Sequence, residues 1–118
     1  MPSYMLLIYN DPADWQKMSP EEMQKALQRF LAWRQKLRSE NILVGGAKLR
    51  DDAGKLLGKS DRVRVTDGPY SETREVLGGY FTIEAANYDA AVERTHDCPA
   101  LDFGGTIEVR EVEPTPGN

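Results

Sequence analysis

The run YMLLIY at residues 4–9 is a continuous apolar segment, and it is ended by Asn10, Asp11 and Pro12. Uninterrupted apolar runs of this kind are typical of strands that are buried on both faces, whereas strands with one wet face alternate apolar and polar residues. We therefore expect residues 4–9 to form the central strand of a sheet, and we place the other elements around it.

The segment SPEEMQKALQRFLAWRQKLRSEN at residues 19–41 predicts one long helix. Ser19 can cap its N-terminus, Pro20 suits the first helical position, and Glu22 completes a Ser-x-x-Glu capping box. The apolar residues that follow recur at helical spacing and form one stripe, made of Met23, Leu27, Phe30, Leu31 and Leu37. We expect this stripe to pack on the sheet.

The rest of the chain predicts further strands at residues 42–50, 62–66, 80–85 and 106–112. The polar, glycine-bearing residues 51–61 predict a hairpin between the first two of these strands. Asn87 can cap a short helix that carries Tyr88, Ala91, Val92 and Thr95. The order is that of a split βαβ plan with an extra strand, so we predict an α+β fold with two helices on one face of an antiparallel sheet.

The strand at residues 80–85 alternates in character along its length. Its apolar residues, Phe81, Ile83 and Ala85, belong under the helices because successive side chains point to opposite faces of a sheet. The other face then receives a polar and aromatic set made of Tyr80, Thr82, Glu84, Thr106, Glu108 and Arg110, joined by Lys48 and by Arg62, Arg64 and Thr66 or their neighbours. Such a face either meets water, as in many antiparallel sheets, or lines a polar cavity.

Composition limits the classes of function that are open to this chain. Its 118 residues suit a single domain, which we expect over residues 1–113 with a flexible tail at 114–118. A net charge of -4 argues against nucleic acid as the ligand. The first apolar run is shorter than a membrane span and has no basic flank, so we expect no membrane partner and a cytoplasmic location.

Cysteine and histidine are too few for the usual structural or metal sites. The single cysteine, Cys98, excludes a disulfide within the chain, and with the single histidine, His96, it cannot build a Cys/His zinc site from one chain. No glycine pair matches a phosphate-binding fingerprint. We therefore expect neither a metal nor a cofactor.

The segment DGPYSETREVLGGYFTIEA at residues 67–85 closely resembles the DGPF-type branch of the YCII-related proteins, whose hallmark is DGPFAETKE followed shortly by GGY. Here Tyr70, Ser71 and Arg74 replace Phe, Ala and Lys of that hallmark. The residues YMLLIY at the start, CPA at 98–100 and GGTIEVREV near the end also look like this family. The resemblance implies a ferredoxin-like subunit of the dimeric α/β barrel group, in which two subunits form a homodimer and their facing sheets enclose a cleft for a small molecule.

The resemblance leaves two functions open. Related YCII-type proteins carry a His and Asp pair in the cleft, which implies an enzyme acting on a small molecule, but the long helix of this chain has no histidine to match. One function is therefore a cofactor-free acid-base reaction, an elimination or an isomerisation. The other is a non-catalytic ligand-binding or regulatory module, because some DGPF-type members are associated with alternative sigma factors.

Several residues are candidates for the site. Asp67 and Glu72 are the catalytic candidates, because carboxylates held together with Glu75 in a sheltered turn can raise one another's pKa into the range of acid-base catalysis. The structural alternative is that Asp67 begins an ordinary Asp-Gly-Pro turn and that Glu72 makes surface charge pairs. The ligand-binding candidates are Tyr9, Lys48, Tyr80 and Arg110.

His96 and Cys98 could be read as a base and a nucleophile. The position of His96 near the end of the short helix and that of Cys98 before Pro99 favour a structural role instead.

Overall fold

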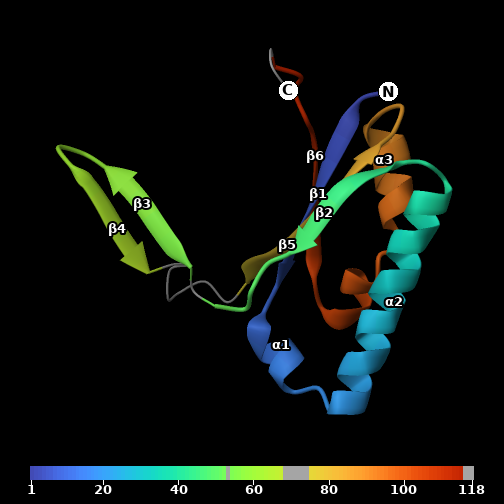
Figure 1. Cartoon of the computed structure of the whole chain (residues 1–118), viewed down its shortest axis with the longest axis horizontal. Helices are drawn as coiled ribbons and strands as arrows, with labels where there is room; N and C mark the ends of the chain where they lie inside the picture. The colour runs from blue at the N-terminus through green and yellow to red at the C-terminus, as the bar shows by residue number, and fades with distance from the viewer. Residues whose placement is uncertain (53, 68–74, 116–118) are drawn as a thin grey trace.

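The computed structural model describes residues 1–52, 54–67 and 75–115 as a layer of helices on one face of a sheet, with a separate hairpin projecting from the sheet (Figure 1). The elements in chain order are β1 (Ser3–Asn10), α1 (Pro12–Gln16), α2 (Pro20–Ser39), β2 (Leu43–Lys48), β3 (Lys55–Lys59), β4 (Val63–Asp67), β5 (Val76–Glu84), α3 (Tyr88–Thr95), the 3-10 helix η1 (Pro99–Phe103) and β6 (Thr106–Glu111).

The main sheet has four antiparallel strands in the order β2-β5-β1-β6. The chain passes from β1 through α2 to β2 and from β5 through α3 to β6, and in both cases one strand separates the two that the helix connects. This is the split βαβ arrangement, so the predicted α+β, ferredoxin-like fold is confirmed. The central position predicted for residues 4–9 is confirmed as well.

The two faces of β1 differ in burial within one chain. Its helix-facing residues Tyr4, Leu6, Ile8 and Asn10 are buried, whereas Ser3, Met5, Leu7 and Tyr9 on the opposite face are only half-buried. The prediction that both faces of this strand are buried is therefore correct, within one chain, only for the face that the helices cover. The reason is that the helices form a layer on one side of the sheet only.

The predicted start of α2 is confirmed atom by atom. Ser19 Oγ accepts a hydrogen bond from the Glu22 backbone N at 3.1 Å, and Glu22 Oε1 accepts one from the Ser19 backbone N at 3.1 Å. The bond from the Ser19 backbone holds the pKa of Glu22 below its ordinary value. Two of the helix's first N–H groups that lack helical partners are thus satisfied by the capping box.

The apolar stripe of α2 is wider than its contact with the sheet. Ala26, Trp33 and Leu37 are buried in the core, and Phe30 packs against it. Leu27 and Leu31, however, remain 53% and 60% exposed. The side of the helix that carries Ala26, Trp33 and Leu37 therefore lies on the core, while Leu27 and Leu31 on the neighbouring side reach beyond it.

The strand pairing predicted for the middle of the chain is wrong. The strand at residues 42–50 does not form a hairpin with that at 62–66: β2 pairs with β5, and β4 pairs with β3, which the sequence analysis did not predict. Lys55–Lys59, KLLGK, holds only two apolar residues and a glycine, so its strand signal is weak. The hairpin leaves Leu57, Val63 and Val65 more than half exposed.

Two short segments complete the description. Helix α1 was not predicted from the sequence; Asp11 Oδ1 caps it by accepting a hydrogen bond from the Ala13 backbone N at 2.9 Å, and Pro12 occupies its first turn. In the predicted tail, residues 114 and 115 are exposed and belong to no helix or strand, and 116–118 lie outside the described residues. Among the helices described, none has the length and apolar character that a membrane span requires.

The capping box gives a direct test of what starts α2. Replacing Ser19→Ala should lower the free energy of unfolding by about 1 kcal/mol, because an N–H group at the helix start loses its acceptor. Urea denaturation measures this loss. Ser39→Ala is the matched control, since the Ser39 hydroxyl bonds only the Lys36 carbonyl in the last turn and its removal should cost little. Equal losses in the two variants would contradict the role of the capping box.

Candidate functional site

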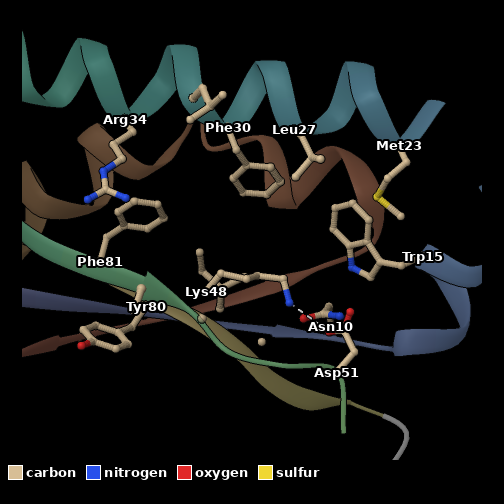
Figure 2. A pocket seen from close by; sticks show the side chains of 15 residues that line it. Asn10, Trp15, Met23, Leu27, Phe30, Arg34, Lys48, Asp51, Tyr80 and Phe81 are labelled. Carbon is tan, nitrogen blue, oxygen red and sulfur yellow. Dashed lines mark hydrogen bonds and ion pairs between the residues drawn. The ribbon is translucent and has the colours of Figure 1, made fainter. Parts of the chain in front are cut away.

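A cavity of about 370 Å³ lies between α2 and the sheet, over the ends of β2 and β5 (Figure 2). Helix α2 supplies one wall with Met23, Leu27, Phe30, Leu31 and Arg34, and Trp15 of α1 closes one end. The strands and the turn after β2 supply the other wall, which consists of Ile8, Asn10, Ala47, Lys48, Asp51 and the segment from Gly78 to Phe81. Most of this lining is apolar.

Aromatic side chains hold the cavity open. Trp15 contacts Phe30 and Phe103, with ring centroids 6.2 and 5.6 Å apart, and so braces α1 against α2 and the 3-10 helix. On the other side of the cavity, Phe81 packs edge-to-face against Trp33 at a centroid distance of 5.0 Å. The N-terminal half of α2 is therefore propped away from the strands rather than collapsed onto them.

The glycine pair of β5 is needed for the shape of the floor. A Cβ at Gly78 would lie 2.0 Å from Asn10 Oδ1, and one at Gly79 would lie 2.9 Å from the carbonyl oxygen of Ala47. Side chains at these positions would displace the Asn10 amide or the neighbouring strand. The Gly-Gly of the GGY sequence therefore admits the Asn10 side chain beside β5.

Asn10 is an unusual residue for a core position. It is the last residue of β1, it is 7% exposed, and among the described residues its Nδ2 has no hydrogen-bond partner. Buried polar atoms are nearly always paired, so an unpaired amide in a cavity wall needs an explanation. A ligand atom that accepts a hydrogen bond is one such explanation.

Arg34 is the second unpaired polar group of the lining. It projects from α2 beside Phe81 (Figure 2), its Nε is buried, and within the described part of the chain Nε has no partner and no carboxylate forms a salt bridge with the guanidinium. Lys48, across the cavity, is different. Its Nζ donates to Asp51 Oδ1 at 3.0 Å and to the Leu49 carbonyl at 2.6 Å.

The ligand-binding residues predicted from the sequence divide between the two faces of the sheet. Lys48 and Tyr80 belong to the cavity lining, although the Tyr80 ring lies on the opposite side of β5 from Phe81 (Figure 2). Tyr9 lies on the face away from the helices, where its hydroxyl donates to Glu108 Oε1 at 3.2 Å. Burial and this hydrogen bond raise the pKa of Tyr9. Arg110 pairs with Met5 across the strands on the same face.

Of the two catalytic residues predicted from the sequence, the structure describes only Asp67, which is not part of the cavity lining. Asp67 is the last residue of β4, and its exposed carboxylate forms an ion pair with Lys55 of β3. Glu72 and the rest of the hallmark at residues 68–74 lie outside the described residues. A catalytic role for Asp67 and Glu72 stays a prediction.

Sequence reasoning missed Asn10 and Arg34. The sequence pattern marks Asn10 only as one of the residues that end the first apolar run, and it assigns no role to Arg34. Arg34 does carry a signal: it follows Leu27, Phe30 and Leu31 by seven, four and three positions, which places a cation on the apolar side of the helix. For Asn10 the sequence holds no comparable signal, because its lack of a partner depends on tertiary packing.

The structure supports a structural role for Cys98. The residue is buried in the core, and burial raises the pKa of its thiol to about 11, so the thiol is protonated at neutral pH. His96 is exposed, and its nearest acidic partner is Glu93, whose carboxylate lies 3.8 Å from Nδ1. Over residues 1–52, 54–67 and 75–115, no group of three His, Cys, Asp or Glu side chains is arranged to hold a metal ion.

The chain is similar to known proteins along most of its length. The sequence profile of the YCII-related domain family matches residues 3–116. An uncharacterized protein of Rhizobium meliloti (strain 1021) is 30% identical over 117 residues, which covers 91% of this chain and 89% of that protein.

The buried thiol allows a test with a chemical probe. At pH 8, we expect Ellman's reagent to label Cys98 about a hundredfold more slowly in the native protein than in urea, because the core excludes the reagent and disfavours the thiolate. The unfolded thiol ionises first, so stability should fall as the pH rises from 9.0 toward 11. Labelling of the native protein at the rate seen in urea would contradict the structural role.

Proposed function

This chain belongs to the YCII-related domain family, and we propose that it is a homodimeric protein that binds a small organic molecule in the cavity beneath α2. The observation that carries the proposal is an open cavity with apolar walls, in which the side chains of Leu27 and Leu31 are more than half exposed and not packed against the sheet. Its volume of about 370 Å³ lies within the range of small-molecule sites. A bound molecule would remove this apolar surface from water.

The shape of the cavity also favours ligand binding over a regulatory module that lacks a ligand. Small-molecule sites combine apolar walls with a few polar groups that fix the orientation of the ligand. Here the apolar walls come from α1, α2 and β5, and the polar groups are Asn10, Arg34, Lys48 and Asp51. The arrangement thus resembles a binding site in composition as well as in size.

Cofactor-free acid-base chemistry is the catalytic form of this proposal. An elimination or isomerisation would use Asp67 with Glu72 as the proton-transferring pair, as the hallmark sequence predicts. Ligand binding in the cavity does not depend on this step, because the described lining residues can hold a ligand without a proton transfer.

The proposed dimer would form through the sheet face away from the helices. Met5 and Leu7 lie at its centre, only half-buried, and are flanked across the strands by Tyr80, Glu108 and Arg110. A half-exposed apolar row with a polar surround is typical of an interaction surface. A second copy of the sheet would bury the face of β1 that the helices leave open.

Sedimentation equilibrium tests the dimer. We expect a dimer at micromolar concentration for the wild type and a monomer for Leu7→Glu, because a second carboxylate in the centre of the face would be buried directly across the strands from Glu108, which carries the same charge. The circular dichroism of the variant should stay unchanged, since Leu7 points away from the helices. A wild-type protein that sediments as a monomer would exclude the dimer and leave the cavity proposal intact.

Binding of the uncharged fluorescent probe N-phenyl-1-naphthylamine tests the cavity. We expect the probe to bind the wild type with enhanced emission, and Leu27→Glu to weaken binding at least tenfold, because the variant places a charge on the apolar wall. Val92→Glu on α3 is the matched control: Val92 is also an exposed helical residue, but it is not part of the lining. Equal binding by all three proteins would refute the cavity as the site.

A further inference from the structure

We propose that the cavity selects an organic anion with an apolar body, whose carboxylate or similar planar anionic group binds the guanidinium of Arg34. The inference rests on the proposed function, since it names the class of ligand that the same site takes. It follows from the charges of the lining, from the burial of Arg34 Nε and from the apolar character of the surrounding walls.

The charges of the lining do not balance. The charged residues of the cavity are Arg34, Lys48 and Asp51. Asp51 accepts a hydrogen bond from Lys48 at 3.0 Å, so this pair is neutral as a unit. Arg34 is then the cation of the lining that has no carboxylate partner among the described residues, and the described lining carries a net positive charge.

The position of Arg34 strengthens the attraction of its charge for an anion. Its Nε is buried, and the neighbouring side chains on α2 and β5 are apolar, so water compensates the charge less than it does at the surface. A guanidinium presents its N–H groups in a planar fork that matches the two oxygens of a carboxylate. An anionic ligand would pair both the charge and the orphaned donors.

The remaining walls define the other end of the ligand. Phe30, Leu27 and Met23 of α2 and Trp15 of α1 offer an apolar surface that extends from the side of Arg34 to the opposite end of the cavity (Figure 2). Asn10 lies on the floor of the cavity with an unpaired Nδ2 and can donate to one acceptor atom of the ligand. The geometry therefore suits an amphipathic acid better than a sugar or a nucleotide, which would need many more polar contacts.

Competition against bound N-phenyl-1-naphthylamine at pH 7.5 tests this inference, with decanoate and 1-decanol as a pair that shares an apolar chain and differs in the charge of the head group. In the wild type, we expect decanoate to displace the probe at a lower concentration than decanol. Arg34→Gln should raise the concentration of decanoate required about tenfold and leave that of decanol within twofold, because only the carboxylate loses its partner.

Arg38→Gln is the control for charge alone, since Arg38 lies one turn further along α2, is exposed and is not part of the lining. It should leave both competitors unchanged. If Arg34→Gln does not fold, the comparison of the two competitors in the wild type still tests the inference. The inference is overturned if decanol displaces the probe at the same concentration as decanoate or at a lower one. Equal effects of the two arginine variants on decanoate would also overturn it.

These outcomes are separate from failure of the proposed function. If the probe binds and Leu27→Glu weakens its binding, the cavity is a ligand site whatever the competitors do. If the competitors show no preference for the anion in that case, only the ligand class is wrong.

Discussion

Trp33 is the contact on which the shape of the molecule depends. Its ring packs edge-to-face on Phe81 of the sheet, with ring centroids 5.0 Å apart, and its Nε1 donates to Oδ1 of Asp97, just after α3, at 3.0 Å. Such an aromatic pair and such a hydrogen bond contribute about 1 kcal/mol each. Together they hold the C-terminal half of α2 on the sheet. Nearer its N-terminus, α2 is held instead through Phe30, which contacts Trp15, and through Arg29, which pairs with Asp102, and there it borders the cavity.

The same anchor links the fold to pH. Partial burial alone would raise the pKa of Asp97, but hydrogen bonds from Lys36 and Trp33 outweigh it and lower the pKa below its ordinary value of 3.8. The ionised carboxylate therefore stabilises the folded state above that value, and this stabilisation is lost as the pH falls through the lower, folded-state pKa. Protonation of Asp97 weakens the contact that fixes α2 on the sheet, so this contact is lost only at a pH below 3.8.

Local signals in the sequence predicted the elements, whereas the site needed tertiary structure. The apolar run at residues 4–9, the Ser19 capping box and the Asn87 cap each depend on a few neighbouring residues, and all three are present in the structure. Which strand β4 pairs with depends on other segments of the chain, and its partner β3 (Lys55–Lys59) has too weak a strand signal to be predicted from the sequence. Asn10 and Arg34 stand out only through the partners they lack, which no local pattern records.

The cavity and the proposed dimer interface lie on opposite faces of the sheet, and β5 contributes residues to both. Alternation along this strand sends Phe81 toward the cavity and Tyr80 toward the face on which the proposed dimer forms. Tyr80 pairs across the strands with Leu7, at the centre of that face, and with Ala47, whose carbonyl lies against Gly79. A second subunit that covers Leu7 and Tyr80 would therefore also fix the backbone beneath the cavity. Dimer formation and ligand binding would then stabilise each other through a shared strand.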